Sequence, residues 1–272
     1  MTTSTLGTAL ITGASTGLGA VYADRLARRG YDLILVARDA GRMEALSATL
    51  SAETGRSIEV LPADLTDRAD VAKVEDRLAS DAAITLLVNN AGMSLNGGLL
   101  DSEVSQVEKL IALNITAPTL LAAAAGKAFA ARKSGGIINI ASVLALLPEM
   151  FDGVYSGSKA YLLNLSKSLA KQLEPQGVRV QAVLPGATRT EIWARSGKDV
   201  DSFPVDWVME ADHLVDASLL GFDRGETITI PPLADEGQWD AYEAARLAMD
   251  GKLSNREVAP RYREAIKEAV AA

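Results

Sequence analysis

The sequence predicts an α/β fold with a single doubly wound, Rossmann-like parallel sheet of about seven strands and helices on both of its faces. Short aliphatic runs alternate along the chain with segments of helical period, and strands that are apolar on both sides are typical of a parallel sheet covered on both faces. The chain has 272 residues, 48% of them hydrophobic, which suits one domain with a sizeable core. We therefore expect one domain over residues 1–272.

Seven aliphatic runs are the expected strands. They span residues 9–11, 33–36, 58–61, 86–88, 137–140, 178–183 and 227–230. Gly30 and Gly177 each follow a helical pattern and predict helix ends, because glycine readily adopts the left-handed conformation found there. Residues 191–211 show no clear periodicity and are predicted to form a loop or lid beside the site. Residues from about 232 to 272 are predicted as a helical C-terminal extension.

Composition excludes several classes of function. The net charge of −8 and a pI near 4.9 would repel a phosphate backbone, so we expect no nucleic acid partner. The absence of cysteine excludes disulfides, thiolate metal sites and a cysteine nucleophile. His213 is the only histidine, so no metal site is expected. The N-terminus lacks the features of a signal peptide, and the apolar stretch 117–131 is interrupted by Lys127, so we expect a cytoplasmic protein without membrane contact.

Tyr155 and Lys159 are the most informative pair in the sequence. Residues i and i+4 of a helix lie on one face, so the phenol and the ammonium can converge on one small molecule. A free tyrosine has a pKa near 10, and a nearby cation is expected to lower it by roughly 1 to 3 units. The spacing therefore predicts an acid/base catalyst.

A glycine-rich turn at residues 12–19 follows the first expected strand and opens the first helix. Such turns let a pyrophosphate approach the free N–H groups of a helix N-terminus, although small-residue turns also serve packing. The spacing Gly-x3-Gly-x-Gly, the Asn89-Asn90-Ala91-Gly92 motif and the set Ser142, Tyr155 and Lys159 together resemble the short-chain dehydrogenase/reductase family. The resemblance covers roughly residues 6–231.

This resemblance implies four catalytic residues. Tyr155 would exchange a proton with the substrate oxygen, Ser142 would hydrogen-bond that oxygen, and Lys159 would hold the nicotinamide ribose and lower the pKa of the tyrosine. Asn114 would help to hold a water of the proton relay through its backbone carbonyl. Taken singly, Ser142 could be a strand-end serine and Asn114 a solvated helical residue.

The resemblance also implies the residues that bind the cofactor. Besides Tyr155 and Lys159 they are Gly13, Ser15, Thr16, Gly17, Leu18, Gly19, Arg38, Asp64, Leu65, Asn90, Ala91, Gly92, Pro185, Gly186, Thr188 and Thr190. By the same resemblance Asp64 would bind the adenine amine; a turn residue and the cap of the next helix are its alternative roles. Gly157 stands where the family usually has alanine, and the C-terminal residues depart from the family pattern.

The end of the second strand indicates the choice of cofactor. A carboxylate there would bind the ribose 2′-hydroxyl of NAD, whereas an arginine accommodates the 2′-phosphate of NADP. Ala37 stands where NAD-preferring relatives carry aspartate, and Arg38 follows it. We therefore expect NADP(H), with NAD(H) as the alternative if Asp39 governs the ribose. Thr16 replaces the second basic residue that many NADP users place in the glycine turn.

The expected function is interconversion of a carbonyl and a secondary alcohol by hydride transfer. By resemblance, an apolar wall faces the nicotinamide and favours a hydrophobic small-molecule substrate; it comprises Met93, Val143, Leu144, Leu147, Met150, Ile192 and Trp193. One alternative is a 3-oxoacyl thioester reductase, for which Arg189 and Arg195 could dock an acidic carrier. The other is a non-catalytic dinucleotide-sensing protein. A homo-oligomer, dimer or tetramer, is expected.

Overall fold

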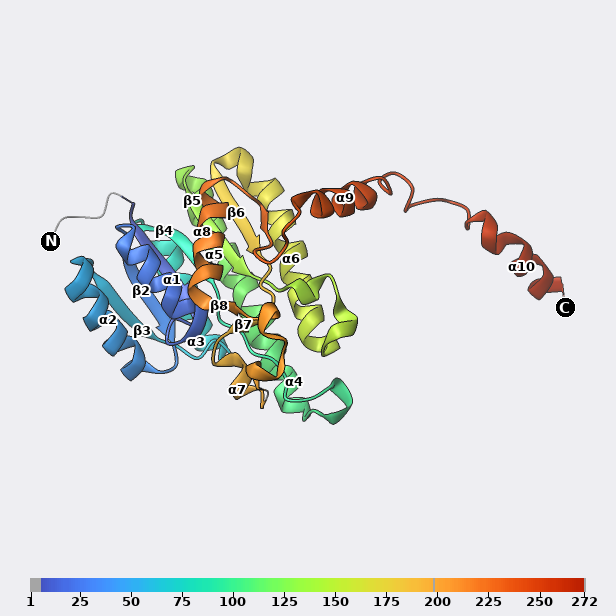
Figure 1. The fold of residues 1–272 in the computed structure, drawn as a ribbon. Coiled ribbons are helices and arrows are strands. Elements are labelled where there is room, and N and C mark those ends of the chain that lie inside the picture. The colour runs from blue at the N-terminus through green and yellow to red at the C-terminus, as the bar shows by residue number, and fades with distance from the viewer. Residues whose placement is uncertain (1–5, 198, 272) are drawn as a thin grey trace. The chain divides into compact units, whose positions relative to one another are not determined.

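The computed structural model describes residues 6–197 and 199–271 and divides the chain into two compact units, Met1–Pro232 and Leu233–Ala272 (Figure 1). The first unit contains a seven-stranded sheet in the order β3-β2-β1-β4-β5-β6-β9, in which every neighbouring pair is parallel. Its strands are β1 Thr8–Thr12, β2 Asp32–Ala37, β3 Ile58–Pro62, β4 Ile84–Asn89, β5 Gly135–Ile140, β6 Val178–Val183 and β9 Ile228–Thr229. The predicted fold class and its strands are confirmed.

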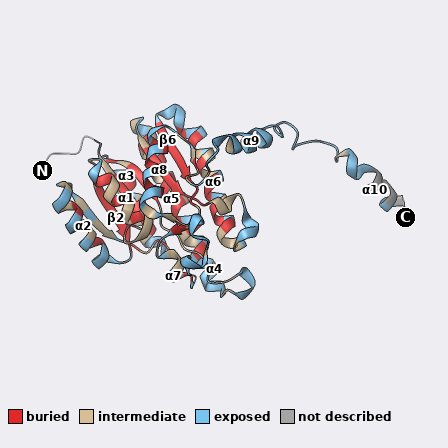
Figure 2. Ribbon diagram, viewed as in Figure 1, coloured by how far each residue is buried: buried red, intermediate tan, exposed pale blue. Residues whose placement is uncertain are grey.

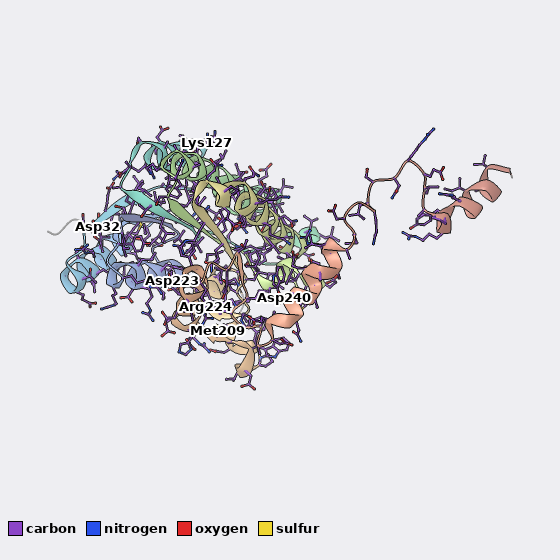
Figure 3. All side chains as sticks on the ribbon, turned by 90° about the horizontal axis from the view of Figure 1, so that it is seen from above. Asp32, Lys127, Met209, Asp223, Arg224 and Asp240 are labelled. Atoms are coloured by element: carbon purple, nitrogen blue, oxygen red, sulfur yellow. The ribbon has the colours of Figure 1, made fainter. Side chains whose placement is uncertain are left out.

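Helices cover both faces of this sheet because alternate strand residues point to opposite sides. Ala9 and Ile11 of β1 belong to one buried cluster and Leu10 to another. Figure 2 shows the buried colour concentrated on the sheet and on the helices packed against it. The first cluster holds the helices α1 Gly17–Arg28, α2 Ala40–Thr54 and α8 Ala211–Asp223 against the sheet. The second holds α3 Arg68–Ser80, α5 Ala117–Arg132 and α6 Gly153–Leu173. Lys127 of α5 and Asp223 of α8 therefore lie on opposite sides of the sheet (Figure 3).

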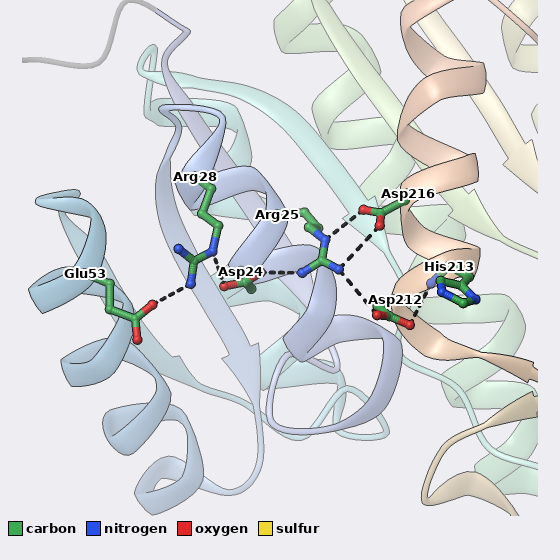
Figure 4. Close-up of polar contacts among 7 residues, drawn as sticks. All are labelled: Asp24, Arg25, Arg28, Glu53, Asp212, His213 and Asp216. Carbon is green, nitrogen blue, oxygen red and sulfur yellow. Dashed lines mark hydrogen bonds and ion pairs between the residues drawn. The ribbon is translucent and has the colours of Figure 1, made fainter.

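Charged residues join the helices of the first face to one another. Arg25 of α1 donates to Asp216 of α8 and to Asp24, and Arg28 bridges Asp24 and Glu53 of α2 (Figure 4). The hydrogen bonds to Asp216 and then to Asp24 raise the pKa of Arg25. Isolated exposed pairs contribute little, but a network of this kind fixes how the three helices meet. His213, at the start of α8, is exposed beside this network.

Both predicted glycine helix ends lie where the chain turns back to the sheet. Gly30 follows α1 with φ +101° and Gly177 has φ +76°. Between α6 and Gly177 the chain makes one further 3₁₀ turn, Glu174–Gln176. A side chain at Gly177 would also press on the carbonyl oxygen of Lys133, which explains why glycine stands there.

Residues 188–210 are more regular than the expected loop. β7 Thr188–Arg189 pairs in parallel with β8 Met209–Glu210, and the short helix α7 Ile192–Arg195 lies between them. Between α7 and β8 the described residues form only the 3₁₀ turns Val200–Ser202 and Val205–Trp207 and irregular backbone, as expected of a loop. The short elements α7 and β8 were not predicted, because a two-residue strand is too short to leave a period-2 pattern in the sequence.

The run Val104–Arg132 is long and apolar enough to cross a membrane by length and composition alone. It consists of α4 Val104–Ile111, a π-helical turn Ala112–Thr116 and α5. Leu121, Ala125 and Phe129 of α5 are fully buried against the sheet, and 44% of the apolar window lies inside the protein. Its apolar character is that of a core helix.

Candidate active site

The glycine turn between β1 and α1 is shaped for close approach of a ligand to the backbone. Gly13 and Gly17 have φ values of +66° and +54°, which favour glycine. A Cβ on Gly19 would collide with the carbonyl oxygen of Gly13, so no side chain fits there. The first turn of α1 contains no acidic residue, which leaves its N-terminus suited to an anion.

The end of β4 braces this turn. The Thr12 hydroxyl oxygen accepts hydrogen bonds from the backbone N–H groups of Asn90 and Ala91, both at 3.0 Å. The Asn90 side-chain amide donates to the carbonyl oxygen of Thr12 at 2.9 Å. Two segments that are far apart in the sequence thus form one rigid edge at the carboxyl end of the sheet, the usual place for a ligand in such folds.

Helix α6 presents Tyr155 and Lys159 at the same edge. Asp152 caps the helix and accepts from the N–H groups of Val154 and Tyr155 at 3.1 and 3.0 Å, which fixes Tyr155 in the first turn. Lys159 lies one turn further on, only 5% exposed, with its Nζ 5.6 Å from the centre of the Tyr155 ring. Ser142, in the segment after β5, hydrogen-bonds Tyr155.

The pKa values of Tyr155 and Lys159 correct one expectation from the sequence, that the cation lowers the pKa of the tyrosine. Burial raises the pKa of Tyr155 to about 12, and the hydrogen bond with Ser142 only partly offsets this rise. Burial also lowers the pKa of Lys159 to about 8. The expected lowering of the tyrosine pKa is wrong for the protein alone, because loss of solvation outweighs the ammonium, which donates to the Ile140 carbonyl oxygen at 2.8 Å.

Asn114 lies in the π-helical turn, 2% exposed, and its side chain joins two segments. Its Oδ1 accepts from the Met93 N–H at 2.9 Å, while its Nδ2 donates to the Met93 carbonyl oxygen at 2.8 Å and to Ser158 Oγ at 3.1 Å. Gly92 borders this junction, since a Cβ there would lie 3.4 Å from Asn114 Oδ1 and 3.5 Å from Lys159 Nζ. Sequence reasoning missed both the π turn and this positioning role.

At the end of β2 the two charged neighbours have different environments. Asp39 caps α2 through the Arg42 N–H at 3.0 Å and pairs with the Arg42 guanidinium at 3.3 Å. Arg38 is exposed, and within residues 6–197 and 199–271 it has no hydrogen bond or ion pair. The carboxylate is therefore engaged in the helix cap, whereas the guanidinium is available to an anion.

Asp64 and Leu65 follow β3. The Asp64 carboxylate accepts from the N–H and the hydroxyl of Thr66 at 3.0 and 2.8 Å. The cap of α3 is Asp67, so the alternative role of Asp64 as that cap was wrong. The two hydrogen bonds from Thr66 agree with the other alternative, a turn residue. Leu65 is 5% exposed and packs in the second core cluster.

The segment after β6 reaches the glycine turn. The Pro185 carbonyl oxygen accepts from the Val143 N–H at 2.9 Å, and the Thr188 hydroxyl donates to the Gly186 carbonyl oxygen at 3.0 Å. A Cβ on Gly17 would lie 3.3 Å from Thr190 Cβ and 3.4 Å from Glu191 Oε2. The structure thus brings Thr190 to the turn, together with Glu191, which sequence reasoning did not single out.

Apolar side chains precede the tyrosine in the sequence, and one of them contacts its ring. Leu147 and Met150 are 50% and 58% exposed just before α6, and Phe151 packs edge-on against Tyr155 at 5.6 Å. The other residues of the expected wall, Met93, Val143, Leu144, Ile192 and Trp193, are partly buried. The sequence analysis did not predict the contact of Phe151 with Tyr155. Phe151 directly follows the turn Pro148–Met150, and the path of the chain through this turn is not evident from the sequence.

Metal chemistry finds no support in the described part of the chain, where no group of three or more His, Cys, Asp or Glu side chains could hold an ion. Of the two arginines considered for carrier docking, Arg189 pairs with Asp201 at 2.7 Å and Glu210 at 3.1 Å. The side chain of Arg195 lies outside the described residues.

Comparisons with known proteins agree with this geometry. Residues 7–201 match the family described as short chain dehydrogenase. A short-chain dehydrogenase from Sphingobium yanoikuyae, solved in complex with NADPH, is 51% identical with a TM-score of 0.92, covering 94% of this chain and 100% of that one. The bulky-bulky ketone specific alcohol dehydrogenase from Comamonas testosteroni is 44% identical with a TM-score of 0.88, covering 95% of this chain and 99% of that one.

A curated relative, the very-long-chain 3-oxoacyl-CoA reductase of Podospora anserina, is 35% identical over 182 residues, 65% of this chain and 53% of that protein. The chain spans little more than half the length of the first curated relatives it matches. The family match, the parallel sheet and the glycine turn lead to one conclusion: the chain belongs to the short-chain dehydrogenase/reductase family.

Proposed function

We propose that the protein is an NADP(H)-dependent oxidoreductase that interconverts a hydrophobic ketone and its secondary alcohol. The observation that carries this proposal is the apolar neighbour of Tyr155: Phe151 packs edge-on against its ring, and Leu147 and Met150 stand exposed in the segment that leads into the same helix. An apolar surface with a few convergent polar groups suits a ketone flanked by bulky apolar groups better than a polyol. The relative named bulky-bulky ketone specific supports the same substrate class.

The residues present fit a dinucleotide. The glycine turn admits a pyrophosphate because Gly13, Gly17 and Gly19 leave no side chain in its way, and the start of α1 favours negative charge. Arg38, exposed and without a partner among the described residues, supplies a guanidinium for a 2′-phosphate, a charge that NADP carries and NAD lacks. The solved relative in complex with NADPH supports this choice.

In the proposed mechanism, hydride transfer is the chemistry that a nicotinamide held at this edge of the sheet would supply. Ser142 donates a hydrogen bond to the substrate oxygen and orients it beside Tyr155. Tyr155, protonated because its pKa is about 12, delivers its proton to that oxygen during reduction. Lys159, with a pKa near 8, can return a proton to the site. Asn114 holds the Met93 loop against α6 and keeps this arrangement in place.

Reduction of a 3-oxoacyl thioester is the second candidate, and the similarity to the very-long-chain 3-oxoacyl-CoA reductase supports it. Arg189, however, is already paired with two carboxylates and is poorly placed to attract an acidic carrier. Nothing favours the alternative of a non-catalytic dinucleotide-sensing protein. The chain has all four residues that the family resemblance implies for catalysis, and the similar proteins are named as dehydrogenases.

A substrate panel tests the proposal. Purified protein is given NADPH or NADH with aryl alkyl ketones, sugars and 3-oxoacyl thioesters, and dinucleotide oxidation is followed by absorbance. We expect the highest kcat/KM with NADPH and an aryl alkyl ketone. A preference for sugars, or for thioesters over all ketones by tenfold or more, would overturn the assigned substrate class.

A further inference from the structure

The start of helix α2 departs from two local rules of helix formation. Asp39 is the cap residue, and the first turn that follows it contains Gly41 and Arg42 and no acidic residue. Acidic residues in the first turn stabilise a helix, and the capping box has glutamate or glutamine three residues after the cap. Arg42 stands at that position with the opposite charge, and Gly41 is a poor helix former. The stability of the helix therefore explains neither residue.

Arg42 engages the carboxylate of Asp39 at both of its oxygens. The Arg42 backbone N–H donates to Asp39 Oδ1 at 3.0 Å, and the Arg42 Nε lies 3.3 Å from Asp39 Oδ2. The two side chains are nevertheless 57% and 53% exposed, so an isolated pair of this kind adds little to stability. What the contact does is to neutralise the charge of Asp39 and to fix the direction of its carboxylate.

The pair lies directly after Arg38, at the carboxyl end of β2. Gly41 leaves the first turn of α2 open, because a Cβ there would meet only Asp39 Oδ1, at 3.8 Å. A carboxylate at the end of this strand suits the ribose 2′-hydroxyl of NAD, and an arginine suits the 2′-phosphate of NADP. The chain thus carries a group for each dinucleotide at adjacent positions, and a third group has to decide between them.

The local charge shows how Arg42 can decide. Arg38 and Asp39 together carry no net charge, and Arg42 makes the sum for these three residues +1. Repulsion between a free carboxylate and a phosphate dianion about 6 Å apart in water changes an affinity by about tenfold. Neutralisation of Asp39 is therefore large enough to set the preference between two dinucleotides that differ by one phosphate.

We propose that Arg42 is a specificity-determining residue for the dinucleotide. Because it engages both oxygens of Asp39, it keeps this carboxylate from a ribose 2′-hydroxyl and removes its repulsion of a 2′-phosphate. Arg38 then binds the phosphate without a competing charge. This inference rests on the proposed preference for NADP(H) and deepens it, since it names the residue that suppresses the alternative site for NAD(H).

Fluorescence titration of the purified full-length protein with NADPH and NADH tests the proposal. Arg42→Gln removes the cation, and we expect it to weaken NADPH binding about five- to twentyfold and to tighten NADH binding about two- to fivefold. Arg28→Gln is the matched control, because Arg28 is an exposed cation that pairs with Glu53 at the other end of α2. The control should leave both dissociation constants within about twofold of wild type.

A double-variant cycle separates an effect through Asp39 from a direct contact with the phosphate. Asp39→Asn removes the carboxylate and keeps a good helix cap. If Arg42 acts through Asp39, then Asp39→Asn/Arg42→Gln should bind NADPH within about twofold of Asp39→Asn. The same weakening by Arg42→Gln in both backgrounds would assign Arg42 a direct phosphate contact and overturn the proposal.

Calorimetry with adenosine 2′,5′-bisphosphate and with AMP isolates the 2′-phosphate. Arg42→Gln should weaken binding of the bisphosphate and leave binding of AMP unchanged, and equal weakening of both would overturn the proposal. Wild type that binds NADH more tightly than NADPH would overturn both the proposed cofactor preference and this inference. Wild type that prefers NADPH, with the same constants in Arg42→Gln, would overturn the role of Arg42 alone.

Discussion

The Lys159 Nζ donates a hydrogen bond of 2.8 Å to the carbonyl oxygen of Ile140, the last residue of β5. This contact ties α6 to the sheet and keeps an almost fully buried ammonium beside Tyr155. No carboxylate pairs with Lys159 among the described residues, so the folded protein bears the cost of desolvating that charge. A ligand that hydrogen-bonds the ammonium would recover part of this cost.

Replacement of Lys159 by methionine should therefore stabilise the protein while it abolishes function. Burial lowers the pKa of Lys159 from 10.5 to about 8, so between these values the unfolded chain holds more proton than the folded one. The wild-type free energy of unfolding then rises with pH through this window. At pH 7, Lys159→Met should be more stable by about 1 to 3 kcal/mol after loss of the Ile140 hydrogen bond.

Urea denaturation of both proteins at several values from pH 7 to pH 10 measures this difference. The range ends at pH 10 because Tyr155, whose pKa is raised to about 12, acts in the opposite sense above it. The gain should shrink as the pH rises. A difference that stays constant with pH would show that Lys159 is not the titrating group.

Arg38 should determine the preference between the two dinucleotides. Loss of a charge-assisted contact to the 2′-phosphate is worth roughly 1.5–3 kcal/mol, so Arg38→Ala should weaken NADPH binding about 10- to 100-fold and leave NADH binding nearly unchanged. Arg29→Ala is the matched control, since Arg29 pairs with Asp223 at the far end of α1. Equal weakening of both dinucleotides in Arg38→Ala, measured by fluorescence titration, would argue against a phosphate contact.

Glu191 should oppose binding of the pyrophosphate. Its Oε2 lies next to the position of a Cβ on Gly17, so a bound anion at the start of α1 would approach a carboxylate. One such repulsion near the surface is worth about 1 kcal/mol, and Glu191→Gln should tighten NADPH binding about fivefold at low salt. The gain should fade at high ionic strength, and Glu103→Gln, a substitution of another exposed glutamate, should have no effect. Weaker binding in Glu191→Gln would mean that the carboxylate assists the ligand.

Two glycines should respond in opposite ways to alanine. A Cβ on Gly157 would meet no atom within 4 Å, so Gly157→Ala should raise the free energy of unfolding by about 0.5–1 kcal/mol through helix propensity. Gly19→Ala should destabilise the protein and weaken dinucleotide binding, because its methyl group would collide with the Gly13 carbonyl oxygen. Thermal unfolding of both variants checks the pair, and destabilisation by Gly157→Ala would show an unrecognised close contact.

The seven sheet strands could be predicted because each is a short run in which aliphatic residues predominate, and this pattern is local to the strand. Arg38 could be located because it directly follows the aliphatic run of β2. Tyr155 could be located because Lys159 lies four residues later on the same helix. The direction of the Tyr155 pKa could not be predicted, since it depends on how far folding buries the phenol. The approach of Glu191 to Gly17 could not be predicted either, because the two residues are far apart in the sequence and come together only in the folded chain.

The most direct test of the proposed mechanism is a comparison of wild type and Tyr155→Phe in NADPH binding and in NADPH oxidation with an aryl alkyl ketone. The substitution removes the proton donor and keeps the ring that packs on Phe151. We predict an NADPH dissociation constant within about twofold of wild type and a turnover lowered by about 10²–10⁴, the usual contribution of a general acid. Unchanged turnover, or loss of binding equal to the loss of turnover, would contradict the role of Tyr155 as the proton donor.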